Sequence, residues 1–133
     1  MKIQISTDYA IRALQYLHDN PGRICTAAEI AEATGVSYSF FIKIANLLRG
    51  RGLVSTKQGR HGGYILGKPA NDITLYDVFF CIEGKPAVSS CLKGSSCVLR
   101  VRDVDCRLRS VLGDLQGTII SELSNCSIAD LAS

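Results

Sequence analysis

The sequence predicts a mainly α-helical chain that carries one small β-hairpin. Two observations lead to this fold class. Apolar residues recur every three to four positions through much of the chain, which is the period of an amphipathic helix. Strand-like apolar runs are confined to two short segments, 53–56 and 63–66, on either side of a glycine-rich hexapeptide. With 133 residues, of which 47% are hydrophobic and 20% charged, the composition is that of a folded domain.

The first predicted helix begins close to the N-terminus. Ser6 or Thr7 can supply its cap, because a side-chain hydroxyl there can accept an unpaired backbone N–H of the first turn. The turn-forming segment 20–22 (Asn-Pro-Gly) then ends the helix. The expected buried positions share helical spacing, and they are Ala10, Ile11, Leu14 and Leu17.

Two further helices are expected close together. Thr26 caps the second helix, and Glu29 completes the spacing of a capping box. A tight turn at 34–36 follows, after which Ser37 or Ser39 opens the third helix. The expected buried positions are Ala27, Ile30 and Ala31 in the second helix and Phe40, Phe41, Ile44, Leu47 and Leu48 in the third. Helix, short glycine-containing turn and helix form the helix-turn-helix pattern.

The hairpin comes directly after this helix pair, where it would form a wing. Its tip, residues 57–62, is basic and rich in glycine. Arg60 and His61 at the tip suit contact with phosphates or insertion into a minor groove. Gly62 and Gly63 would let the backbone approach a ligand closely. Residues 1–70 are therefore predicted to be a winged helix-turn-helix domain for DNA binding.

Charge is distributed unevenly along the chain. The formal net charge is +3, but residues 1–68 contain nine Lys and Arg against four Asp and Glu, a net charge of +5. Residues 69–133 contain six basic and eight acidic residues, a net charge of −2. Between residues 33 and 71 there is no acidic residue at all. A stretch of one sign attracts polyanions, so the first half is expected to bind nucleic acid.

The second half, residues 71–133, is predicted to hold a sensor loop and a dimerisation helix. A helix is expected over 74–80, a loop from 84 to about 96, and a long helix from Val101 or Cys106 to Ser124. The apolar stripe of the long helix is broad, and it consists of Leu108, Val111, Leu112, Leu115, Ile119, Ile120 and Leu123. A stripe of this width favours burial against a second copy of the chain. The alternative is a helix that closes the core of a single chain.

Three of the six cysteines lie in or beside the predicted loop. Cys91, Cys97 and Cys106 have the spacing C-x5-C-x8-C, and nearby Lys and Arg side chains would favour their thiolate forms. Three thiolates match an iron–sulfur cluster with one outside ligand. Zinc is an alternative, although the CxxC pairs typical of structural zinc are absent. A further alternative is that these three cysteines hold no metal and are redox-active or packed thiols. Cys25, Cys81 and Cys126 are interpreted as packing residues, and the alternative for Cys81, which lies close to the loop, is a spare ligand.

Several segments resemble the Rrf-type (BadM/IscR/NsrR) family of winged-helix transcription regulators over nearly the whole chain. The matching segments are 6–14, 28–36, 51–54, the wing sequence 59–66 (Gly-Arg-His-Gly-Gly-Tyr-Ile-Leu), and 127–131 (Ser-Ile-Ala-Asp-Leu). The resemblance implies a homodimer that binds DNA. In cysteine-bearing members of the family it also implies a 2Fe–2S or 4Fe–4S cluster held by three loop cysteines, here Cys91, Cys97 and Cys106.

The resemblance also suggests a fourth ligand. The segment 106–109 is similar to the third-cysteine segment of NsrR-type nitric oxide sensors, in which an aspartate of the partner's first helix completes the site. Asp8 stands at the matching position. A first-turn residue favoured by the helix dipole is the alternative role for Asp8. Two departures stand out: Arg109 replaces the His expected three residues after the last cysteine in IscR-type members, and the x8 spacing exceeds the usual x5.

The expected function is a homodimeric transcription regulator, a repressor, that senses nitric oxide, redox state or iron–sulfur status and binds a pseudo-palindromic operator. Phosphate contacts are assigned to Lys43, Arg49, Arg51, Lys57, Arg60 and the amides of Gly62 and Gly63, with His61 in the wing. Base contacts are assigned to Ser37, Tyr38, Ser39 and Lys43. One alternative keeps the fold but responds through cluster-free thiols or a partner enzyme. A more distant one is a small iron–sulfur electron carrier.

Other classes find less support in the sequence. No nucleophile–base constellation or phosphate loop indicates an enzyme. No apolar run approaches the roughly 18 residues of a membrane span. The N-terminus reaches Asp8 too soon for the apolar core of a signal peptide, so a cytoplasmic location is expected.

Overall fold

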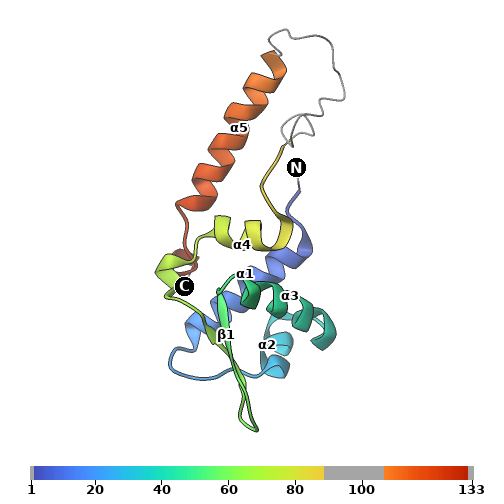
Figure 1. Cartoon of the computed structure of the whole chain (residues 1–133), viewed down its shortest axis with the longest axis vertical. Helices are drawn as coiled ribbons and strands as arrows, with labels where there is room; N and C mark the ends of the chain where they lie inside the picture. Colours follow the sequence, from blue (N-terminus) through green and yellow to red (C-terminus); the bar gives the residue numbers. More distant parts are fainter. Residues whose placement is uncertain (1, 89–106, 132–133) are drawn as a thin grey trace.

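A computed structural model of the chain describes residues 2–88 and 107–131. In these ranges the predicted fold class is confirmed: α-helices dominate, and one antiparallel hairpin forms the wing (Figure 1). The elements are α1 (Ile5–Asp19), α2 (Ala27–Thr34), α3 (Tyr38–Gly50), β1 (Val54–Lys57), β2 (Gly63–Leu66), η1 (Ala70–Asp72), α4 (Leu75–Glu83), α5 (Arg107–Ser124) and η3 (Ala129–Leu131). The predictions for Cys91, Cys97, Cys106 and a long helix starting at Val101 lie outside the described residues.

Helix α1 begins at Ile5, earlier than its sequence suggests, because the group that caps it comes from a distant part of the chain. The N-cap residue is Gln4 and makes no side-chain cap, so the prediction of Ser6 or Thr7 as the cap is wrong. Instead the carboxylate of Glu83, at the end of α4, accepts the backbone N–H of Gln4 at 3.2 Å. The same carboxylate accepts the hydroxyl of Thr7, whose side chain is buried. A carboxylate at this position also complements the positive end of the helix dipole.

The helix-turn-helix forms as predicted. The Thr26 hydroxyl accepts the Glu29 amide at 3.2 Å, and the Glu29 carboxylate accepts the Thr26 amide at 2.7 Å, which completes the capping box. Gly35 ends α2 with φ +75°, a conformation that favours glycine. Ser37 then caps α3 by accepting the Phe40 amide at 3.3 Å. The turn between α2 and α3 is thereby fixed at both ends.

One hydrophobic core lies between α1, α2 and α3 and continues beneath α4. Its largest fully buried side chains include Leu14, Ile30, Ile44, Leu48, Leu53, Ile73, Val78 and Ile128. Burial of each such side chain stabilises the fold by about 1.5–3 kcal/mol. Leu47 is 49% exposed, so its prediction as a buried position of α3 is wrong. The buried face of α3 contains Phe41, Ile44, Ala45 and Leu48.

The wing pairs β1 with β2 in the register Val54↔Leu66 to Lys57↔Gly63. The chain before α2 adds a third short pairing, because Cys25 and Tyr64 exchange both backbone hydrogen bonds, at 3.0 and 2.8 Å. A Cβ atom at residue 63 would lie 2.3 Å from the Cys25 carbonyl oxygen, so only glycine allows this close approach. The base of the wing is therefore attached to the start of α2.

Helix α5 extends away from the other helices, at the end of the molecule opposite the hairpin (Figure 1). None of its residues is buried, and Leu108, Val111 and Leu115 are 61%, 62% and 49% exposed. The described residues therefore do not support the alternative in which this helix closes the core of one chain. No helix of the described ranges combines the length and the apolar character needed to cross a membrane.

After α5 the chain returns to the core. Ile128 is fully buried, and its amide donates to the Ile73 carbonyl at 2.8 Å. Ser127 and Asp130 bond each other reciprocally, at 2.9 and 3.2 Å. The Leu131 carbonyl accepts the Gln15 side chain of α1 at 3.3 Å. The motif at 127–131 is thus a capped turn that attaches the end of α5 to the hydrophobic core.

Candidate nucleic-acid interface

Helix α3 has one face in the core and one face in solvent. Its buried residues anchor it against α1 and α2, and the ring of Phe41 meets Tyr64 of the wing edge-on at 5.4 Å between centroids. On the opposite side Ser39 and Lys43 are exposed, four residues apart and so on the same face. At the start of the helix Tyr38 is 59% exposed. The core thus fixes the position of α3, while its polar face is exposed to solvent.

Ser37 has a different role from the other predicted base-reading residues. Its hydroxyl accepts the amide of Phe40 and caps α3. The oxygen is therefore engaged in setting where the helix begins. Any contact of Ser37 with DNA would use the hydroxyl proton, which this cap leaves free.

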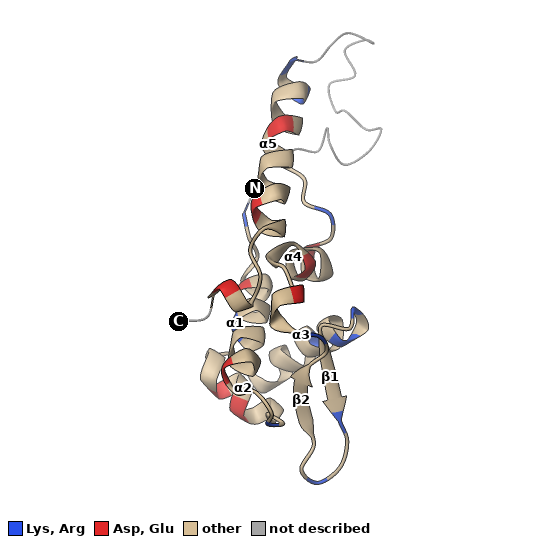
Figure 2. Cartoon of the chain, turned by 90° about the vertical axis from the view of Figure 1, so that its left-hand side faces the viewer, with Lys and Arg blue, Asp and Glu red and all other residues tan. Residues whose placement is uncertain are grey.

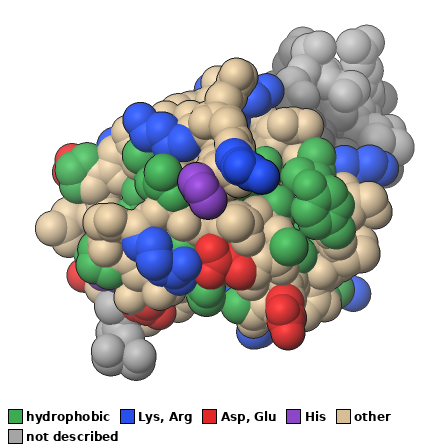
Figure 3. Space-filling view, turned by 90° about the horizontal axis from the view of Figure 1, so that it is seen from below, with side chains coloured by type: hydrophobic (Ala, Val, Ile, Leu, Met, Phe, Trp, Pro, Cys, Tyr) green, Lys and Arg blue, Asp and Glu red, His purple; other side chains and the backbone are tan. Residues whose placement is uncertain are grey.

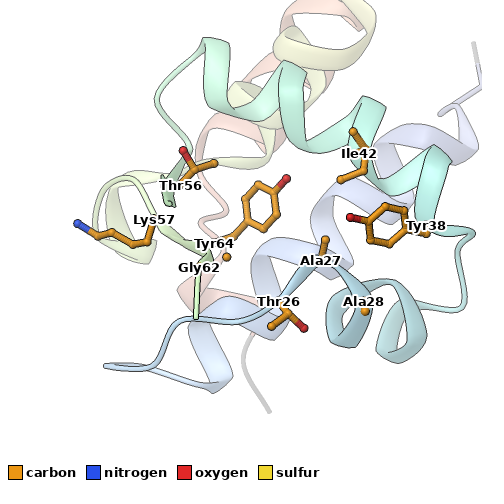
Figure 4. A pocket seen from close by; sticks show the side chains of 10 residues that line it. Thr26, Ala27, Ala28, Tyr38, Ile42, Thr56, Lys57, Gly62 and Tyr64 are labelled. Carbon is orange, nitrogen blue, oxygen red and sulfur yellow. The ribbon is translucent and has the colours of Figure 1, made fainter. Parts of the chain in front are cut away.

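A groove of about 350 Å³ lies between the start of α2, α3 and the base of the wing (Figure 4). Tyr38 and Ile42 line it from α3, and Lys57, Gly62 and Tyr64 line it from the wing. In Figure 4 the ring of Tyr64 stands between the wing and α3. Partial burial raises the pKa of the Tyr64 hydroxyl, which keeps it a neutral hydrogen-bond donor. The structure thus brings together four residues predicted separately: Tyr38, Lys57, Gly62 and Gly63.

The tip of the wing is tightly turned. Gly59 has φ +112°, and the Gly62 amide donates to the Gly59 carbonyl at 3.0 Å. A Cβ atom at residue 62 would lie 2.2 Å from the Lys57 carbonyl oxygen. Arg60 and His61 are exposed on this tip. The glycines therefore allow the tight turn, and the side chains of Arg60 and His61 are exposed on it.

Positive charge gathers on the end of the molecule that carries the wing. Figure 2 shows Lys and Arg on the hairpin and at the end of α3, and Asp and Glu mainly on α1, α2, α4 and α5. Figure 3 views this end from below, with several Lys and Arg side chains and a few acidic ones across the face. Such a face suits a polyanion, since each neutralised phosphate releases counterions.

The two arginines at the end of α3 differ in their surroundings. Arg49 is exposed on the helix. The guanidinium of Arg51 lies over the ring of Phe80 in α4, 4.7 Å from its centroid. The thiol of Cys81, the next residue, donates to the Leu47 carbonyl at 3.1 Å. Arg51 and Cys81 thus join the end of α3 to α4, a role that residue spacing alone does not reveal.

Asp8 is exposed in the first turn of α1. Its carboxylate pairs with Arg12 at 3.2 Å, one turn further along. It borders a hollow of about 980 Å³ that is otherwise largely apolar, with Ile5, Ile11 and Phe40 in its lining. Within residues 2–88 and 107–131, no group of three or more His, Cys, Asp or Glu side chains could hold a metal ion. The ligand set of Asp8 with Cys91, Cys97 and Cys106 includes residues outside these ranges and remains a prediction.

The other three cysteines occupy packing positions. Cys25 is buried beneath the wing, and Cys81 is half-buried between α3 and α4. Burial raises the pKa of both thiols. The positive charge of Arg51 partly offsets this increase for Cys81. A raised pKa disfavours the thiolate, which is the form that binds metals. The half-buried Cys126 directs its thiol to the Ser127 carbonyl at 3.7 Å. These surroundings agree with their interpretation as packing residues.

Comparison with known proteins identifies the family. The model of the Rrf2 family, described as iron-dependent transcriptional regulators, matches residues 3–133. The chain belongs to the Rrf2 family. Members of this family are DNA-binding transcription regulators and not enzymes, and the winged helix described above is their fold.

Solved structures of Rrf2 regulators have the same fold. IscR of T. potens is 26% identical, covers 98% of this chain and 85% of its own length, and superposes with a TM-score of 0.76. CymR, the global cysteine regulator of B. subtilis, is 23% identical with coverages of 99% and 96% and a TM-score of 0.82. The oxidised form of Staphylococcus aureus CymR is 23% identical with coverages of 100% and 97% and a TM-score of 0.79.

Proposed function

We propose that this Rrf2 regulator is a homodimeric repressor whose DNA affinity depends on an iron–sulfur cluster. In this proposal residues 1–70 bind a pseudo-palindromic operator, and residues 71–133 sense and dimerise. The observation that carries it is the wing end of the molecule, where α3 and the hairpin present a basic face anchored in the core. The acid-free stretch from residue 33 to residue 71 builds nearly all of that face.

The DNA contacts divide by position on this face. The exposed start of α3 would enter the major groove, with Tyr38, Ser39 and Lys43 facing base edges. The wing would follow the neighbouring backbone, with Lys57 and Arg60 on phosphates and His61 at the minor groove. The remaining assigned contacts are Ser37, through its free hydroxyl proton, the guanidinium groups of Arg49 and Arg51, and the amides of Gly62 and Gly63.

Dimerisation is assigned to α5. Three large apolar side chains on one side of this helix are about half exposed or more. Exposed apolar area of this kind on an 18-residue helix is stabilised by contact with a second copy. Each copy would present one reading head, the DNA face formed by α3 and the wing. Two reading heads related by a twofold axis account for a pseudo-palindromic operator.

The cluster would be held by Cys91, Cys97 and Cys106, with Asp8 of the partner subunit as the fourth ligand. The donor set supports iron–sulfur chemistry, since three thiolates and one weaker oxygen ligand leave one iron site open to exchange. When bound, the cluster supplies reactivity toward nitric oxide and oxidants. The exposed position of Asp8 beside an apolar hollow leaves its carboxylate accessible to a second chain. In the chain itself, the Asp8 carboxylate accepts a hydrogen bond from Arg12, and both side chains are exposed.

A second candidate keeps the same DNA face and drops the cluster. Its support is the similarity in fold to two CymR proteins. The CymR of B. subtilis is a global cysteine regulator, and the CymR of Staphylococcus aureus has been solved in an oxidised form. Here the three loop cysteines would respond as thiols, or a partner enzyme would control the regulator. Iron content separates the two candidates.

DNA binding is tested by fluorescence anisotropy with duplex DNA over a range of salt concentrations. Lys57→Ala and Arg60→Ala should each weaken binding and lower the slope of log affinity against log salt by about one. Lys85→Ala is the matched control, because Lys85 is exposed just beyond α4, away from the wing. Slopes that stay equal in all four proteins would refute the assigned face.

The cluster is tested by anaerobic purification with iron and sulfide assays and a visible spectrum. Single Cys→Ala changes at 91, 97 and 106 should remove the iron, whereas Cys126→Ala should retain it. Asp8→Ala should weaken retention of iron. Iron-free wild-type protein that binds its operator under thiol control would favour the second candidate. Equal DNA affinity of the loaded and iron-free proteins would refute cluster-dependent regulation.

A further inference from the structure

The solvent-facing side of α3 contains a carboxamide, that of Asn46, which can hydrogen-bond a base edge and is not among the DNA contacts proposed so far. Asn46 is exposed on α3, three residues after Lys43 and seven after Ser39. With 3.6 residues per turn, positions 39, 43, 46 and 50 form one stripe along a helix. All four are exposed, while 41, 44, 45 and 48 on the opposite side are buried. Asn46 therefore belongs to the same reading edge as Ser39 and Lys43.

The carboxamide of Asn46 is available for an outside partner. Side chains at both ends of α3 make hydrogen bonds, such as those of Ser37 and Cys81. Among the described residues, no side-chain hydrogen bond involves the Asn46 carboxamide. A carboxamide carries one acceptor and one donor group side by side. That pair matches the N6 donor and N7 acceptor of adenine in the major groove.

The position of Asn46 along the helix extends the reading edge. Seven residues separate it from Ser39, which corresponds to about 10 Å along the helix axis. This distance is about three base-pair steps. Ile42, one turn before Asn46, lines the groove shared with the wing, so this side of α3 is the side beside the hairpin. Gly50, the next residue of the stripe, has open space around it and leaves room for the DNA backbone.

We propose that Asn46 is a specificity-determining residue that selects adenine at one position of each operator half-site. This inference rests on the proposed DNA face of α3. It adds a direct base contact deeper along the helix than Ser37, Tyr38 and Ser39, which lie at its start. Lys43, a compact cation beside it, would contact a neighbouring guanine or phosphate.

The test begins with selection from randomised duplexes by the wild-type dimer and by Asn46→Ala. The wild type should select adenine at a position in each half-site where Asn46→Ala shows no preference. On the selected duplex, replacing that adenine should weaken wild-type binding about 5- to 150-fold and leave Asn46→Ala nearly unaffected. The matched control is Asn71→Ala, which removes an exposed carboxamide from η1 and should keep the wild-type preference.

Two further measurements isolate the contact. Replacing the adenine by 7-deazaadenine, which lacks the N7 acceptor, should weaken the wild type and not Asn46→Ala. Affinity for random-sequence DNA at low salt should be equal in both proteins, because Asn46 carries no charge. A selected sequence that is the same for wild type and Asn46→Ala overturns the role of Asn46 and leaves the DNA face standing. A wild type that neither selects a sequence nor binds DNA at low salt overturns both.

Discussion

At the residue scale, Gly63 is a position where the addition of one methyl group disturbs the backbone of a neighbouring segment. The sequence suggested that this glycine lets the wing approach DNA, but the structure shows a close approach within the protein itself. Its Cα faces the Cys25 carbonyl, where an added Cβ would lie 2.3 Å from the oxygen and 2.8 Å from the carbon. Both atoms belong to the backbone of the bridge between Cys25 and Tyr64. Relief of this steric clash therefore requires movement of the chain before α2.

Gly63→Ala is therefore expected to destabilise the protein by about 1–3 kcal/mol, the usual cost of forcing an extra methyl group into a packed place. Urea denaturation followed by circular dichroism measures the change. The control is Gly50→Ala, where nothing lies within 4 Å of the added Cβ. In that helical position alanine should be neutral or stabilising by up to about 1 kcal/mol. Equal stability of Gly63→Ala and wild type would show that the wing base can separate from Cys25 without cost.

Glu29 gives a second prediction, in which stability depends on pH. The pKa of its carboxyl group is lowered, first by the Thr26 backbone N–H and then by Arg23 and Tyr16, while burial opposes the shift. Because the folded-state pKa lies below the unfolded one, the stabilisation is present above the unfolded pKa of about 4.3 and is lost as the pH falls through the folded value. Glu29→Gln keeps an acceptor for the cap and removes only the charge-dependent part.

At pH 7 Glu29→Gln should be less stable than wild type by about 0.3–1 kcal/mol, and the difference should shrink as the pH falls. Urea unfolding at pH 7 and at a series of lower pH values measures this change. Glu32→Gln on the same helix removes an exposed carboxylate that takes no part in the cap and serves as the control. A Glu29→Gln deficit that persists in acid would mean that the charge does not contribute.

At the element scale, the start of α1 depends on the end of α4. Glu83 accepts the Gln4 amide and the Thr7 hydroxyl, and the chain leaves α4 at the next residue, Gly84. The segment with the three loop cysteines follows a few residues later. Asp8 sits in the α1 turn that Glu83 fixes. Any displacement of the end of α4 would therefore be transmitted to the first turn of α1.

A double-mutant cycle with Thr7→Val and Glu83→Ala tests this connection. Since Thr7 is buried and its partner is charged, a coupling energy of about 1.5–3 kcal/mol is expected from urea unfolding of the four proteins. The control cycle pairs Thr7→Val with Glu122→Ala, on exposed α5, and should be additive. Additivity in the first cycle as well would indicate that the two side chains contribute separately.

The elements also explain what the sequence could and could not predict. Caps that use residues three positions apart, such as Thr26 with Glu29, are visible in a sequence because the partners are local. The cap of α1 is not visible, because Glu83 lies 79 residues from Gln4. Leu47 fits the helical pattern of a buried residue but lies on a side of α3 that no described element covers fully, so periodicity alone overestimated the core.

The same distinction holds for the candidate interface. Exposure of Ser39, Lys43, Lys57 and Arg60 follows from the polar positions of an amphipathic helix and a hairpin tip. The stacking of Arg51 on Phe80 does not, because it depends on how α4 crosses the end of α3. Asn46 could have been found by extending the Ser39 and Lys43 stripe one more turn along the helix.

At the scale of the whole molecule, residues 2–88 and 107–131 share one hydrophobic core. Ile73, Val78 and Ile128 of the second half belong to the same hydrophobic cluster as Leu14 and Ile44 of the first. Arg51 on Phe80 and Glu83 on Thr7 add polar links between the halves. A change at the base of α5 or the end of α4 can therefore reach the reading head through packed contacts, without a flexible linker between them.

The exposed apolar stripe of α5 is expected to form the contact between the two copies of the dimer. Leu108, Val111 and Leu115 lie at i, i+3 and i+7, on one face, and a buried charge among them would be costly in a dimer. Val111→Glu should therefore give a monomer at micromolar concentration in analytical ultracentrifugation. Ser110→Glu introduces the same charge on another face of α5 and should remain dimeric.

The consequence for DNA follows from effective concentration. In a dimer, binding of one head places the second at its half-site, which raises affinity for a two-site operator by about 10²- to 10⁴-fold over a single head. Val111→Glu should lose this gain on the full operator while binding an isolated half-site as well as wild type does, both measured by anisotropy. If Val111→Glu is monomeric and still binds the full operator with wild-type affinity, a single head suffices. The twofold symmetry assigned to this regulator would then have no role in recognition.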